Sequence, residues 1–184
     1  MPSAPTPLSS TRAYTGRVIA VDVETLRTPA GATIDLEIIR HKGAAAVVPV
    51  LSPLDSDDPT LLLIHQFRHA AGGFIWEIPA GVLGDGESPE ECARRELKEE
   101  TGAEAGSIQR LTTILTTPGF TDERIHLFVA TDLKIGEPQR EHDEFIETGT
   151  MPLSRCLAMI RDGEIQDGKT VAALLYLAGF TLGL

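Results

Sequence analysis

Residues 81–103 read GVLGDGESPEECARRELKEETGA, and this stretch decides the fold. Its second part predicts a helix over residues 88–101, because both ends carry the usual signals. Ser88 is a good N-cap, a proline follows at the first helical position, and Glu91 completes a capping box. Gly102 stands where helices commonly end on a glycine. The three glycines that precede the helix predict a loop whose backbone can approach a ligand closely.

Carboxylates cluster on one side of this predicted helix. At about 100° per residue, Glu96 and Glu100 lie on the same helical face, and Glu99 flanks them. Like charges four residues apart destabilise a helix by about 0.2–0.5 kcal/mol, so the cluster opposes folding. Two interpretations follow: a solvated acidic face, or a site for a divalent cation. Carboxylate oxygens with few histidines or thiols nearby suit Mg²⁺ or Mn²⁺ rather than zinc, with substrate phosphates completing the coordination shell.

Most of the sequence on either side of the predicted helix is typical of β-strands. Alternating and β-branched sequence predicts them at residues 17–26, 33–40, 45–51, 60–67, 76–78, 108–115, 125–130 and 145–147. The first two are joined by a TPAGA turn and form a predicted hairpin. Two more helices are predicted at residues 153–161 and 168–180. Strands around a central helix, followed by further helices, predict an α/β (α+β) sandwich with a mixed sheet.

The chain is acidic, with 16 Lys and Arg against 27 Asp and Glu and a formal net charge of −11. This balance argues against a nucleic-acid partner, which would need a basic surface. The 42% of hydrophobic residues argues against disorder. The apolar run of residues 44–51 is too short to span a bilayer, no signal peptide is visible, and two cysteines do not make a disulfide framework. We therefore expect a cytoplasmic protein that binds neither nucleic acid nor membrane.

The opening stretch resembles the box of the Nudix hydrolase family, G-x5-E-x7-R-E-U-x-E-E-x-G-U, in which U is a bulky apolar residue. All seven invariant identities are present, at Gly81, Glu87, Arg95, Glu96, Glu99, Glu100 and Gly102. Leu97 fills the first apolar position, whereas the small Ala103 fills the second only weakly. The resemblance implies a Nudix fold, which is a mixed β-sheet sandwiched between helices with a loop-helix-loop box. It also implies hydrolysis of a nucleoside diphosphate linked to another moiety.

The resemblance implies a role for each charged residue of the box. Glu96 and Glu100 are similar to the family's metal ligands, and Glu99 to a further ligand, directly or through water. Arg95 lies four residues before Glu99 and would orient the acidic side chains. Glu87 would anchor the loop to the helix. Within the box, the predicted catalytic residues are therefore Arg95, Glu99 and Glu100.

Sequence outside the box resembles the ADP-ribose pyrophosphatase subfamily. Pro118 follows Gly102 by sixteen residues and opens a PGFTDE sequence similar to one in that subfamily, although an ordinary Pro-Gly turn would look the same in isolation. Residues 66–68, Gln-Phe-Arg, are similar to the subfamily's Q-x-R, whose arginine contacts the diphosphate. The planar fork of a guanidinium suits phosphate oxygens. Residues 77–81, EIPAG, resemble the segment that leads into the box, where the carbonyl of the alanine, Ala80 here, coordinates a metal.

A further carboxylate is implied for a loop after the sheet. Residues 141–147 read EHDEFIE, and the DEFIE part is similar to the family's D/E-E-x-I-E pattern. Glu144 is therefore assigned as the loop carboxylate, either as a metal ligand or as the general base. Some relatives carry a second acid two residues earlier, where this chain has His142. The general base is left open between Glu144, a box glutamate and His142.

The resemblance implies hydrolysis of ADP-ribose to AMP and ribose 5-phosphate, with two to three Mg²⁺ or Mn²⁺ ions. The implied metal ligands are the Ala80 carbonyl and the carboxylates of Glu96, Glu99, Glu100 and Glu144. The implied substrate-binding residues are Arg40, Arg68, Glu77, Val82 and Glu123. Among them, Arg68 would contact phosphate, Arg40 adenine or phosphate, and Glu123 the terminal ribose hydroxyls. The alternatives are another nucleotide sugar, such as GDP-mannose, or a non-catalytic nucleotide sensor.

Three regions are expected along the chain. Residues 1–13 hold three prolines and three serines with almost no apolar content, and they predict a disordered leader. Residues 14–43 form an N-terminal strand region. In the ADP-ribose subfamily such strands commonly cross between two subunits, which implies a homodimer with contacts in this region. Residues 44–184 form the expected Nudix hydrolase domain.

Overall fold

The computed structural model describes residues 3–139 and 145–184, and the chain divides into two compact units. The first unit contains Met1–Gly43 and Leu115–Arg124, and the second contains Ala44–Ile114 and Ile125–Leu184. No helix in the described ranges is long and apolar enough to cross a membrane.

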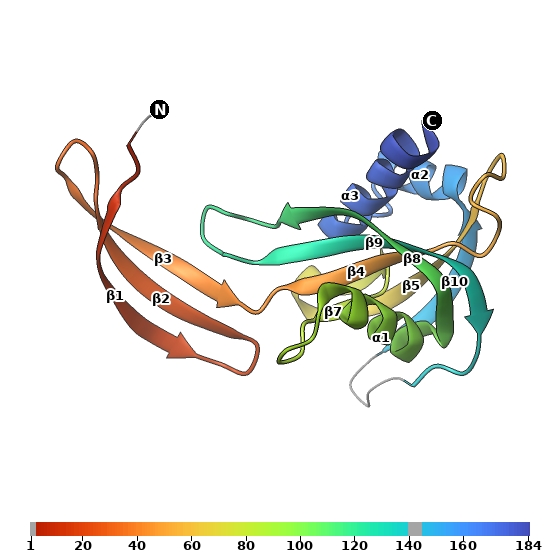
Figure 1. The fold of residues 1–184 in the computed structure, drawn as a ribbon, viewed down its shortest axis with the longest axis horizontal. Coiled ribbons are helices and arrows are strands. Elements are labelled where there is room, and N and C mark those ends of the chain that lie inside the picture. Colours follow the sequence, from red (N-terminus) through yellow and green to blue (C-terminus); the bar gives the residue numbers. More distant parts are fainter. Residues whose placement is uncertain (1–2, 140–144) are drawn as a thin grey trace. The chain divides into compact units, whose positions relative to one another are not determined.

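The first unit is an antiparallel sheet in the order β1-β2-β3 (Figure 1). Strand β1 spans Thr6–Thr15, β2 spans Ile19–Arg27 and β3 spans Thr33–His41. Strands β2 and β3 pair without a register shift, so the predicted hairpin is confirmed.

The predicted disordered leader is wrong from Thr6 onward, because β1 pairs with β2 along its length. Every side chain of β1 is exposed, which explains why its composition resembles that of a disordered segment. Main-chain hydrogen bonds to β2 order the strand, and a composition argument does not detect such bonds.

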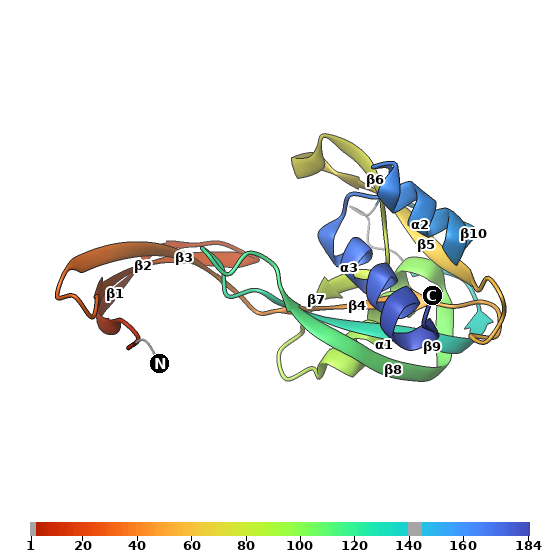
Figure 2. The same ribbon diagram turned by 90° about the horizontal axis from the view of Figure 1, so that it is seen from above.

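The second unit contains two sheets (Figure 2). The larger sheet has the order β7-β4-β9-β8, and its strands are Ala80–Val82 (β7), Ala44–Pro49 (β4), Arg124–Ile135 (β9) and Ala103–Leu115 (β8). The smaller sheet has the order β10-β5-β6, with strands Ile146–Pro152 (β10), Thr60–Arg68 (β5) and Gly73–Glu77 (β6). Strand β4 pairs parallel with β9 and antiparallel with β7, which confirms the mixed sheet.

Helices cover both faces of the larger sheet, as predicted (Figure 1). Helix α1 spans Pro89–Thr101, α2 spans Leu153–Arg161 and α3 spans Gly168–Tyr176. Strand β4 is fully buried, and its alternate residues point to opposite faces of the sheet. Ala46 and Val48 pack in the cluster that includes residues of α2 and α3. Ala45 and Val47 pack in the cluster under α1. The small side chains let both layers pack closely. A short 3₁₀ helix at His69–Ala71 and a π-helical turn at Leu177–Leu182 complete the elements.

Helix α1 begins and ends as its sequence predicts. The Ser88 side chain accepts from the Glu91 N–H, and the Glu91 carboxylate accepts from the Ser88 N–H, so the capping box is formed. Gly102 adopts a φ of 75° after the last turn and donates its N–H to the Lys98 carbonyl at 2.8 Å. A Cβ on Gly102 would lie 2.3 Å from the Gly136 carbonyl oxygen, so this position needs glycine for space as well as for conformation.

Candidate active site

The box starts on the larger sheet and continues into α1. Strand β7 pairs with β4, and the loop after it leads directly to the helix. A Cβ on Gly81 would lie 1.8 Å from Oε1 of Glu96. Glycine is therefore the residue that lets the Glu96 carboxylate lie against the backbone of β7.

Arg95 connects three of the four invariant glutamates of the box. Its Nε and Nη2 donate to the two carboxylate oxygens of Glu87 at 2.8 and 3.0 Å. Its Nη1 donates to Glu96 at 2.6 Å and to Glu99 at 3.0 Å. Glu87 also accepts from the Gly84 N–H at 2.8 Å, which ties the loop to the helix. Hydrogen bonding to Arg95 lowers the pKa of Glu87 to about 2.

Glu96 and Glu100 form a buried pair on one face of α1. Glu96 is 8% exposed and Glu100 is 2% exposed. The Ala80 N–H donates to Oε2 of Glu100 at 3.1 Å, so this carboxylate lies against the segment that leads into the box. The burial of two like charges one helical turn apart excludes the interpretation as a solvated acidic face.

The donors present fit a hard divalent cation. Two buried carboxylates beside a main-chain segment supply oxygen ligands, which Mg²⁺ prefers, and Mg²⁺ usually keeps water and substrate oxygens in its shell. Residues 3–139 and 145–184 contain no group of three or more His, Cys, Asp or Glu side chains arranged to hold a metal ion.

A second charged cluster lies beside the segment that leads into the box. Arg68 donates to Glu77 through Nε and Nη2, each at 2.8 Å. Lys169 on α3 donates to the same Glu77 carboxylate at 2.7 Å and to Asp167 at 2.9 Å. Burial raises the pKa of Glu77, but the hydrogen bonds and charges of Arg68 and Lys169 outweigh it and hold the pKa below its usual value.

Sequence reasoning found Arg68 and Glu77 but missed Lys169. The positive end of the helix dipole disfavours a lysine in the first turn of a helix. A lysine at this position therefore indicates that an anionic partner lies nearby. Its partner Glu77 is 92 residues earlier in the sequence, a distance that no local pattern spans.

The other described residues predicted for the site lie outside the cluster around Glu77. Val82 is exposed, and its carbonyl accepts from Nη2 of Arg95. Arg40 belongs to the first unit, where its partners are Asp22, Glu24 and Asp122. Glu123 belongs to the same unit. Glu144 and His142 lie outside the described residues.

Glu123 contacts two residues of the first unit. Its carboxylate accepts from the Thr116 hydroxyl at 2.9 Å and lies 3.4 Å from Nδ1 of His41. The substrate-binding roles predicted for Arg40 and Glu123 stay predictions.

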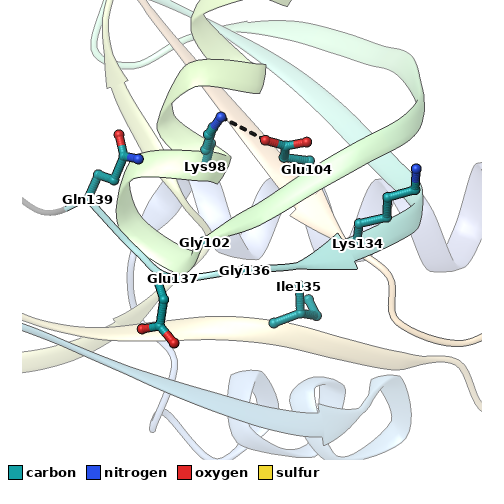
Figure 3. Close-up of a pocket in the computed structure, with 8 residues that line it drawn as sticks. All are labelled: Lys98, Gly102, Glu104, Lys134, Ile135, Gly136, Glu137 and Gln139. Atoms are coloured by element: carbon teal, nitrogen blue, oxygen red, sulfur yellow. Dashed lines mark ion pairs between the residues drawn. The ribbon is translucent and has the colours of Figure 1, made fainter.

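A cavity of about 370 Å³ lies at the C-terminal end of α1 and does not include any of the predicted site residues (Figure 3). Its charged and polar lining is Lys98, Glu104, Lys134, Glu137 and Gln139. Lys98 and Glu104 form an ion pair at 2.7 Å, and the lining side chains do not converge on one point. The box and the cluster around Glu77 are therefore the stronger candidate for the site of chemistry.

Comparison with known proteins identifies the family. The NUDIX domain matches residues 41–174. An ADP-ribose pyrophosphatase of Bacillus subtilis is 40% identical over 166 residues, which is 89% of this chain and 87% of that protein. An ADP-ribose pyrophosphatase of Mycobacterium tuberculosis is 34% identical over 179 residues, 96% of this chain and 84% of that protein. The chain therefore belongs to the Nudix hydrolase family, as its box predicts.

A solved structure agrees with the fold. It is described as the crystal structure of an ADP compounds hydrolase, and it matches with a TM-score of 0.85 at 24% identity. The match covers 100% of this chain and 97% of that one. The Nudix fold predicted from the box is thereby confirmed.

We predict a pH-dependent contribution of Glu87 to stability. Because its pKa is lowered to about 2 in the folded protein, its contribution is fully present above the ordinary pKa of about 4.5 and is lost as the pH falls toward 2. Glu87→Gln should lower the free energy of unfolding at pH 7, and its difference from wild type should shrink between pH 5 and pH 2. Urea unfolding at each pH measures both. Glu90→Gln, which changes an exposed carboxylate in the first turn of α1, is the control. A difference that stays constant with pH would contradict the assignment.

Proposed function

We propose that the chain hydrolyses the diphosphate bond of ADP-ribose to AMP and ribose 5-phosphate. The observation that carries this proposal is the segment of residues 77–80, which contacts Arg68 at one end and Glu100 at the other: Arg68 donates to Glu77 at 2.8 Å, and the Ala80 N–H donates to Glu100 at 3.1 Å. Hydrogen bonding to Glu77 raises the pKa of Arg68, and the negative charge of Glu100 adds to the effect. The proposed phosphate-binding cation, Arg68, and the proposed metal-binding carboxylate, Glu100, thus lie within electrostatic reach of each other. The names of the two relatives above support the choice of ADP-ribose.

The proposed cofactor is two to three Mg²⁺ or Mn²⁺ ions. Their proposed ligands are the Ala80 carbonyl and the carboxylates of Glu96, Glu99, Glu100 and Glu144. Bound there, the ions would neutralise the diphosphate and lower the pKa of the attacking water. This chemistry would reconcile an acidic protein with an anionic substrate.

The chain's own residues would position the reactants. Arg95 holds the Glu96 and Glu99 carboxylates in place, and Gly81 leaves room for Glu96. Arg68 would contact the diphosphate with the part of its guanidinium that Glu77 does not occupy. The general base stays open between Glu144, a box glutamate and His142.

A second candidate substrate is another nucleotide sugar. A relative named GDP-mannose pyrophosphatase, from Yersinia enterocolitica, is 43% identical over 126 residues, 64% of this chain and 65% of that protein. The complete set of box carboxylates does not favour a non-catalytic sensor. The expected cytoplasmic location stays a prediction.

A homodimer is proposed from the first unit. Asp22 is the only buried side chain among this unit's described residues, while Leu8, Tyr14, Ile34 and Leu36 are exposed. A sheet of three strands needs a covered apolar face for stability. A second copy of the chain would supply that cover.

For the substrate, we predict that ADP-ribose is hydrolysed with a kcat/KM at least about tenfold above that of GDP-mannose. The assay incubates the protein with Mg²⁺ and each substrate and measures release of AMP or GMP. A higher kcat/KM for GDP-mannose would establish the second candidate. No release from either substrate would overturn the proposed reaction.

For the metal site, we predict that Glu100→Gln lowers kcat roughly a hundredfold or more. The amide oxygen can still accept from the Ala80 N–H, so the melting temperature should change little. Glu104→Gln, which removes an exposed carboxylate just after α1, is the matched control and should keep wild-type kcat. Near-normal turnover of Glu100→Gln with Mg²⁺ would show that the metal assignment is wrong.

For assembly, we predict a mass in solution of about twice 19.8 kDa, measured by analytical ultracentrifugation. Ile34→Asp combined with Leu36→Asp places charges on one face of β3 and should produce monomers. Leu175→Asp, at an exposed position of α3, should remain dimeric. A monomeric wild-type protein would rule out the homodimer.

A further inference from the structure

Lys169 occupies a position that helix formation does not explain. It lies in the first turn of α3, where the helix dipole disfavours a cation. Its side chain is only 10% exposed, so a flexible charged chain has been ordered and largely removed from water. The ammonium group donates to Glu77 and Asp167. These contacts are the only described ones that compensate for its burial.

Glu77 receives three hydrogen bonds from two cations. Oε1 accepts from Nε of Arg68, and Oε2 accepts from both Nη2 of Arg68 and Nζ of Lys169. The Glu77 side chain is 2% exposed, whereas that of Arg68 is 40% exposed. In the described part of the chain, no hydrogen bond occupies Nη1 of Arg68. The guanidinium therefore has one edge fixed by Glu77 and one edge open to a ligand.

The first turn of α3 is also bonded to the residue after Glu77. The Ile78 N–H donates to the Thr170 hydroxyl at 2.9 Å, and that hydroxyl donates to Asp167 at 2.6 Å. Asp167 accepts from the Thr170 N–H as well, as the N-cap of the helix. Side chain and backbone at residues 77–78 are thus held by two neighbouring residues of α3.

We propose that Lys169 is a positioning residue for substrate binding: by fixing the Glu77 carboxylate from α3, it directs the open edge of Arg68 toward the substrate diphosphate. This inference rests on the proposed function. Without Lys169, Glu77 would be held at its carboxylate by Arg68 alone, and the two side chains could move together. A bidentate arginine recognises phosphate through a defined geometry, so a shift of its plane weakens binding.

The first experiment compares Lys169→Gln with wild type in steady-state kinetics with ADP-ribose. KM should rise about tenfold, while kcat changes less than about twofold. Lys169→Arg keeps the charge and should recover most of the loss. Arg155→Gln removes a cation from an exposed ion pair with Glu164 on the same unit and should leave KM unchanged. A wild-type KM for Lys169→Gln, or a lowered melting temperature without a change in KM, would overturn the proposal.

The second experiment tests whether Lys169 acts through Arg68. In an Arg68→Gln background, Lys169→Gln should raise KM less than about twofold further, because the group it positions is gone. A full tenfold rise in that background would show that Lys169 acts independently of Arg68, which contradicts the proposal. If Lys169→Gln does not fold, Lys169→Met takes its place in both experiments, since an apolar chain of similar length suits a buried site.

The two proposals fail in different ways. If wild type does not release AMP from ADP-ribose, the proposed substrate is wrong. The same variants are then measured with GDP-mannose, the second candidate substrate. If wild type is active and Lys169→Gln keeps its KM, the reaction stands and the role of Lys169 does not.

Discussion

The hydrogen bonds of Arg95 to three carboxylates are the interaction on which the rest of the site depends. Helix α1 places several acids within one turn of each other, an arrangement that repulsion would oppose. One guanidinium bonds Glu87, Glu96 and Glu99 and leaves Glu100 to the backbone of β7. The same group reaches the loop through Glu87, so helix and loop become one rigid piece. The acids are thereby held in position before any ligand binds, which reduces the reorganisation that binding requires.

Helices whose ends carry local sequence signals could be predicted from the sequence. The capping residues Ser88 and Glu91 and the terminal Gly102 located α1, and helix α2 has the predicted bounds. The contacts of Lys169 and Arg40 could not be predicted, because their partners are distant in sequence and are set by packing. Strand β1 was missed for a related reason: its order comes from main-chain pairing with β2 and not from its side chains. Strands β8 and β9 extend beyond their predicted bounds, since pairing continues past the apolar residues.

Helix α3 has two roles in the second unit. Its apolar residues, among them Ala173 and Leu174, belong to the core against β4. Its first turn carries Lys169 and Thr170, which hold residues 77 and 78. Helix α3 therefore contacts the candidate site as well as the core.

The pair of glycines at 102 and 136 fixes where the chain leaves the sheet. The Gly136 N–H donates to the Gly102 carbonyl at 2.9 Å, and the Gln139 N–H donates to the Glu99 carbonyl at 2.8 Å. At residue 145, where the described chain resumes, the Phe67 N–H donates to the Phe145 carbonyl at 3.1 Å. Gln139 is thus bonded to the box helix, and Phe145 is bonded to the strand that carries Arg68. Two backbone hydrogen bonds therefore anchor the described chain on both sides of residues 140–144, and neither bond depends on a side chain.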